Sequence, residues 1–185
     1  MSSSFGGRDL PVAAGAVAGV AAWILGYLGT YVIAGTRIRE SVLGQVLEFV
    51  GDGAAVYKLV GWVFYNSHLV GTVFEGVPAG VTNAVGGDGF TPLLFLVAPA
   101  LLVGAGLAVG RSQGVEAPGD GVVAGLAVVP GYLFLSVVGV VVFVVSAGPA
   151  SGRPDPLPAV VLAGVLYPAA FGAAGGALAG ATEGT

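Results

Sequence analysis

The sequence has no cysteine, one histidine and one lysine, and only 9% of its 185 residues are charged. The lack of cysteine excludes disulfides, thiolate metal sites and thiol catalysis. Its six basic residues are scattered along the chain, which argues against the clustered cations that bind nucleic acid. Soluble domains contain about 25% charged residues. This scarcity of charge therefore indicates that most of the chain is not in contact with water.

Two motifs of common catalytic sites are also missing. The sequence has no phosphate-binding loop ending in Lys-Ser or Lys-Thr, and no His-Glu-x-x-His. One helical turn to either side of His68 there are only aromatic, glycine and threonine residues, and no second metal ligand or carboxylate. This favours a histidine bonded to backbone at the membrane interface over a proton relay. We expect no catalytic, cofactor-binding or metal site and no enzyme activity.

Long uncharged stretches are the main feature that is present. Hydrophobic residues make up 56% of the chain, and four stretches lack any charge: 10–36, 89–110, 121–152 and 156–182. Each is longer than the roughly 20 residues with which a helix crosses a hydrocarbon core of about 30 Å. The first is too long for the apolar part of a secretory signal, so we expect a retained span. We predict an all-α polytopic transmembrane helix bundle, a single membrane domain over 1–185, with spans at approximately 12–34, 92–110, 121–147 and 159–180.

Two of the predicted spans contain proline. Pro130, followed by Gly131, removes a backbone hydrogen bond within the third span and should kink it. Pro168 lies within the last span. The short polar connection at 113–120 makes the second and third spans antiparallel neighbours.

Residues 37–75 carry charges at regular intervals and predict an amphipathic, interfacial helical segment. Apolar residues recur at helical spacing in two successive stretches, 42–50 and 56–64. Lys58 is the only charge in 54–73, which leaves a fifth crossing open as an alternative. Residues 76–89 are rich in glycine and predict a loop.

The second of these stretches gathers aromatic and hydrogen-bonding side chains in a chain built mostly from Ala, Val, Gly and Leu. Rings with a polar edge suit either anchoring among lipid headgroups or a specific contact. The residues that form this candidate interaction surface are Tyr57, Trp62, Phe64, Tyr65, Asn66 and His68.

Glycine recurs at every fourth position of the last span, at Gly172, Gly176 and Gly180. Glycines at this spacing share one face of a helix and allow another helix to approach closely. We predict that this is a helix-packing face. Packing within the chain and self-association are both open interpretations of it.

Two segments carry a resemblance to a known family. They are Gly19-Val-Ala-Ala-Trp-Ile-Leu-Gly-Tyr-Leu-Gly-Thr-Tyr in the first span and Tyr57-Lys-Leu-Val-Gly-Trp-Val-Phe-Tyr-Asn-Ser-His. Both are similar to segments of an uncharacterised multi-pass membrane protein family of halophilic archaea, and the order of spans is similar over nearly the whole chain. That family has no established activity or site residues, so the resemblance implies a location and no mechanism.

For function, we expect a multi-pass protein of the cell membrane that acts as a non-enzymatic component through helix, lipid or partner contacts. Its expected partners are the lipid bilayer and either a second copy or another subunit of a membrane complex, without nucleic acid. The alternative is a small oligomeric transporter or channel, although the spans hold few polar side chains for a solute path. The basic residues divide four to two between the two ends, which places both termini outside the cell.

Overall fold

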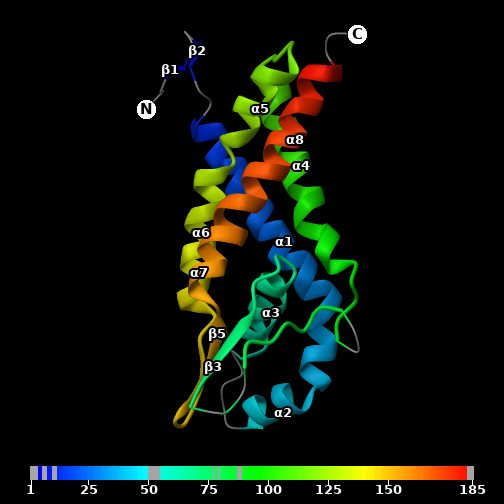
Figure 1. The fold of residues 1–185 in the computed structure, drawn as a ribbon. Helices are drawn as coiled ribbons and strands as arrows, with labels where there is room; N and C mark the ends of the chain where they lie inside the picture. The colour runs from blue at the N-terminus through cyan, green and yellow to red at the C-terminus, as the bar shows by residue number, and fades with distance from the viewer. Residues whose placement is uncertain are drawn as a thin grey trace.

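Four helical spans in the computed structural model are long and apolar enough to cross a membrane. They are α1 (Val12–Glu40), α4 (Leu94–Ser112), α5 with α6 (Pro118–Val142), and α7 through α8 (Pro156–Thr182). The spans run side by side along the molecule (Figure 1). The structure describes residues 4–5, 8–9, 12–49, 55–76, 78, 80–86 and 89–182. This arrangement confirms the predicted all-α bundle with four spans.

The third span is two helices, α5 (Pro118–Leu126) and α6 (Val129–Val142). The break lies at Ala127 and Val128, just before the kink predicted at Pro130, because proline fits without cost in the first turn of a new helix. Helix α6 ends at Val142, so the predicted helix through residue 147 was too long. Residues Val145–Ala147 instead form a strand, β4.

The last span changes its helical form along its length. It begins as α7 (Pro156–Pro158), continues as a π-helical stretch, η1 (Ala159–Leu166), and ends as α8 (Tyr167–Thr182). Pro168 lies in the first turn of α8 and has no N–H to donate to the carbonyl of Gly164. The wider π turns therefore occur directly before the residue that interrupts the regular ladder.

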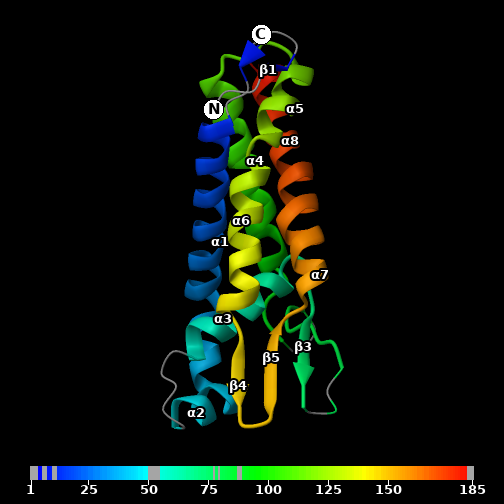
Figure 2. The same cartoon turned by 90° about the vertical axis from the view of Figure 1, so that its left-hand side faces the viewer.

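One end of the bundle, called the base here, carries two short helices and a small sheet (Figure 2). The helices are α2 (Val42–Phe49) and α3 (Ala55–Asn66), and the strands are β3 (Thr72–Glu75), β4 and β5 (Ala150–Pro154). The sheet is antiparallel in the order β3-β5-β4, with Thr72 opposite Pro154. Two further short strands, β1 (Ser4–Phe5) and β2 (Arg8–Asp9), pair near the opposite end.

The described part of the segment that left a fifth crossing open, residues 55–73, contains no crossing. Helix α3 has 12 residues and is therefore about 18 Å long, which is too short to cross a hydrocarbon core of about 30 Å. The described residues of 76–89 contain no helix and make isolated bridges, between Thr72 and Thr82 and between Val85 and Phe90.

The three glycines of the predicted packing face contact other parts of the same chain. A Cβ atom built on Gly176 would lie 1.9 Å from the carbonyl oxygen of Gly121, on α5. The equivalent positions on Gly172 and Gly180 would lie 2.8 Å from the Gly125 oxygen and 2.3 Å from the Ala117 oxygen. Any side chain on this face would clash with backbone. The face is therefore covered within the chain.

Candidate functional site

Helix α3 rises from the base along α1 and reaches α6 through its side chains. In its second half, the indole Nε1 of Trp62 donates a hydrogen bond to the carbonyl oxygen of Phe143 (2.7 Å). One turn higher, the Tyr65 hydroxyl donates to the carbonyl oxygen of Ser136. His68, just beyond the helix, bonds to Tyr132. The three bonding partners, residues 143, 136 and 132, are therefore spread over about 16 Å along the axis of α6 and its C-terminal end.

The chain then turns and goes back to the base. Strand β3 follows at once and pairs with β5, and the N–H of Asp155 donates to the carbonyl oxygen of Gly71 (2.9 Å). Residues 55–75 thus enter and leave the bundle on the same side, and we call them the re-entrant segment. Such a segment is tolerated at membrane depth where its backbone is buried in protein.

The turn of the re-entrant segment contains a residue in a conformation that costs free energy. Leu69 has φ 62°, in the left-handed region that costs a residue with a side chain about 1–2 kcal/mol. Its side chain is 60% exposed. Such strain persists only where the surroundings enforce it, so the contacts on either side of Leu69 must hold the turn.

Asn66 provides several of those contacts. Its Nδ2 donates to the carbonyl oxygen of Val70 (2.8 Å) and to the Thr72 hydroxyl (3.2 Å). Its Oδ1 accepts a hydrogen bond from the backbone N–H of Ala84 (2.9 Å). One buried amide therefore joins the end of α3, the returning chain and the 80–86 loop.

His68 is fully buried and bonded at both ring nitrogens. Its Nδ1–H donates to the carbonyl oxygen of Phe64 (2.7 Å), because a carbonyl can only accept. Its Nε2 then accepts a hydrogen bond from the Tyr132 hydroxyl (2.6 Å). His68 lies outside the four spans, and burial lowers its pKa to about 4. The ring is therefore neutral at physiological pH, and it joins the re-entrant segment to α6 without carrying charge.

Aromatic rings fill the space around the re-entrant segment. Trp23 of α1 meets Phe64 edge to face (centroids 5.0 Å apart) and stacks on Phe143 (6.2 Å). The Tyr27 hydroxyl donates to the Tyr57 carbonyl oxygen (3.0 Å) near the base. In the described part of the chain, Trp23 Nε1 and Ser136 Oγ are buried without a hydrogen-bond partner. The rings therefore close the lower interior of the bundle by packing.

The six residues predicted as an interaction surface lie together, but mostly inside the protein. Trp62, Phe64, Tyr65, Asn66 and His68 are each at most 8% exposed. Tyr57, at the base, is 37% exposed. The cluster therefore connects α3 to α1 and α6, and only Tyr57 offers a sizeable outer surface.

The chain matches a family of unknown function, DUF7978, over residues 2–183. It belongs to this DUF7978 family. No curated protein and no solved structure matches it. The resemblance to an uncharacterised family is thus confirmed to that extent, and the halophilic archaeal origin stays a prediction.

Four residues of the DUF7978 site were missed in the sequence because each lies far from α3 along the chain, in a span or directly after one. They are Tyr132, Ser136, Phe143 and Tyr167, and Tyr167 places its ring 5.0 Å from that of His68. A signal for two of them exists: Tyr132 and Ser136 are polar residues one helical turn apart in an otherwise apolar span. Polar groups within a span usually face the bundle interior.

Proposed function

We infer that this DUF7978 protein is a non-enzymatic, multi-pass component of the cell membrane that acts through contacts with a partner protein or a second copy. The observation that carries this proposal is the re-entrant segment, which occupies the bundle interior where a channel would need water. A bundle whose lower interior is filled by protein in this way supports a role carried by its outer surfaces.

The polar groups of the interior support this proposal. The Tyr65 hydroxyl is bonded to α6, and the Tyr132 hydroxyl of α6 is bonded to His68. The Thr30 hydroxyl donates to the carbonyl oxygen of Gly26 in its own helix (2.9 Å). Among the described residues of the four spans, charged side chains occur only in the last turns of α1 and α4 and the first turn of α5. Transport of a polar solute usually needs ionisable groups at mid-membrane.

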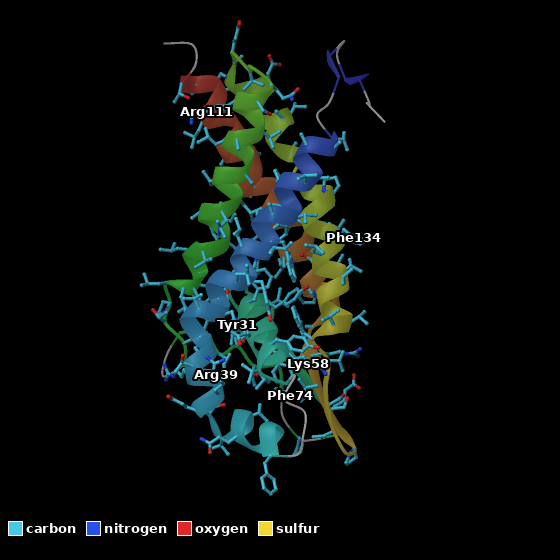
Figure 3. All side chains as sticks on the ribbon, turned by 180° about the vertical axis from the view of Figure 1, so that it is seen from behind. Tyr31, Arg39, Lys58, Phe74, Arg111 and Phe134 are labelled. Atoms are coloured by element: carbon cyan, nitrogen blue, oxygen red, sulfur yellow. The ribbon has the colours of Figure 1, made fainter. Side chains whose placement is uncertain are left out.

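The outer surface of the spans suits contact with lipid, and that of the base suits contact with another protein. Large apolar side chains such as Val32 and Leu96 are exposed on the spans, and Phe134 points away from the bundle (Figure 3). Helix α1 has 29 residues and is about 43 Å long, so its base end extends beyond a core of about 30 Å. There α2 exposes Phe49 to 92%. Val42, seven residues earlier on the same face of α2, is 80% exposed. An exposed apolar face beyond the lipid suits a protein contact.

Copurification from native membranes tests the proposal. We expect the natural chain to retain a partner or a second copy, and Phe49→Ser to reduce that recovery about tenfold or more, as loss of an aromatic anchor does. Phe134→Ser, the same change on a lipid-facing ring, is the matched control and should keep recovery. In parallel, vesicles containing the purified protein should show no solute flux above empty vesicles. Flux that depends on the protein would support the transporter alternative instead.

Both termini are expected outside the cell, with the base in the cytoplasm. Arg39 and Lys58 lie at the base and Arg111 at the opposite end (Figure 3). Because basic residues favour the cytoplasmic side, an impermeant maleimide should label Gln113→Cys in intact cells and Ser146→Cys only after permeabilisation. The chain has no cysteine, so each variant carries a single reactive thiol. The reverse pattern of labelling would invert the proposed orientation.

A further inference from the structure

Two adjoining cavities lie at the base, beside the re-entrant segment. The larger has a volume of about 230 Å³, and its walls include Ile38 of α1, Trp62 of α3 and Phe90. The smaller, of about 170 Å³, extends towards the sheet. Both are lined by Leu43, Trp62 and Phe74. Trp62 thus borders both cavities.

The chemistry of the larger cavity favours an apolar occupant. Most of its wall is apolar, and its polar residues are Ser41, Asn66, Thr72 and Thr82. The Ser41 hydroxyl is hydrogen-bonded to the backbone of its own turn, and Asn66 and Thr72 are hydrogen-bonded to each other. An ordered water molecule needs two to four polar partners, and three of these four polar side chains already have hydrogen-bond partners within the protein. An empty apolar cavity forfeits the dispersion contacts of its lining atoms. A hydrocarbon chain would restore those contacts.

A cation stands at the rim of this cavity. The guanidinium of Arg37 lies 5.5 Å from the ring centroid of Phe90, a wall residue, and donates to the carbonyl oxygen of Gly89 (2.8 Å). Ile38, the next residue along α1, lines the cavity itself. Arg37 is exposed and lies in the last turn of a span, where headgroups are expected. An apolar cavity with a cation at its rim complements a molecule with a hydrocarbon chain and an anionic head.

We propose that the larger cavity binds one hydrocarbon chain of an anionic membrane lipid, with the headgroup beside Arg37. This inference rests on the membrane location in the proposed function. It does not depend on a protein partner, and its test uses purified protein, so either proposal can fail while the other stands.

Tryptophan fluorescence can report on the cavity directly. The chain has two tryptophans, and Trp23→Phe leaves Trp62 as the only one. That change removes no hydrogen bond, since Trp23 Nε1 has no partner. Purified Trp23→Phe protein in detergent is titrated with a phosphatidylglycerol that carries brominated chains, and with a phosphatidylcholine that carries the same chains. We expect saturable quenching by the anionic lipid, at an affinity at least about fivefold higher than for the zwitterionic one.

Three variants in this background decide the assignment. Ala84→Leu places a larger side chain in the cavity wall and should abolish saturable quenching, with Thr82→Leu as the substitute if Ala84→Leu fails to fold. Ala100→Leu, in the separate groove between α1 and α4, is the matched control and should leave quenching unchanged. Arg37→Gln should make the two lipids bind alike. Absence of saturable quenching, undiminished quenching in the filled variants, or equal affinities in the unfilled protein would each overturn the proposal.

Discussion

Gly176→Leu should strongly destabilise the bundle. A Cβ at this position would lie 1.9 Å from the Gly121 oxygen, so the clash is with backbone that cannot move without separating two helices. Overpacking of a closed interface costs about 1–3 kcal/mol or more, and we expect the upper end. For a chain of this size the midpoint of thermal unfolding should fall by about 6–12 °C.

Leu178→Ala is the matched control for this prediction. Leu178 lies on the same helix, two residues further along, and its side chain is half exposed. Its truncation should lower the midpoint by only a few degrees. Both variants are compared by thermal unfolding in one detergent, followed by the near-ultraviolet signal of the aromatic core. Equal tolerance of the two changes would show that α8 does not pack on α5 as described.

His68→Phe should cost about 1–3 kcal/mol, because it leaves the buried Tyr132 hydroxyl without its acceptor. Tyr132→Phe alone should lower the free energy of unfolding by a similar amount, since it leaves the Nε2 of His68 without a hydrogen-bond donor. When both partners become apolar no polar atom is left unpaired. The double variant should therefore be more stable than the sum of the single effects predicts, with a coupling free energy of about 1–2 kcal/mol.

The coupling is measured with a double-mutant cycle of unfolding free energies in detergent. Tyr31→Phe provides the control cycle with His68→Phe, because the Tyr31 hydroxyl bonds to the exposed Arg39 and not to the histidine. That pair should be additive. A His68 and Tyr132 cycle that is also additive would contradict the hydrogen bond between α6 and the re-entrant segment.

The four spans could be predicted from the spacing of charges because lipid tolerates few of them. Arg37, Arg111 and Arg153 mark ends of spans in the sequence and lie at or beyond helix ends in the structure. Local helix boundaries depend on packing instead. The break before Pro130 lies against Gly15 and Gly19 of α1, and nothing in the third span alone reveals that contact.

The sequence predicted the residues of the cluster around α3, but it did not predict that most of them are buried inside the bundle. An aromatic ring with a polar edge has the same local pattern whether it faces lipid headgroups or the bundle interior. What distinguishes the two is the set of partners, and these are distant in sequence. Tyr65 bonds to a residue 71 positions later, and Trp62 to one 81 positions later. Contacts between residues this far apart produce no periodic pattern in the sequence around either residue.

The re-entrant segment also constrains the order in which the chain can assemble during synthesis. Its hydrogen-bond partners on α6, Tyr132 and Phe143, leave the ribosome well after residues 55–75. Until they arrive, the Nε2 of His68 and the indole N–H of Trp62 have no hydrogen-bond partner, and unpaired polar groups are costly in lipid. The segment must therefore wait at the cytoplasmic surface, on the proposed orientation, and dock late. Chaperone or insertase contact with nascent chains should be longest at this stage.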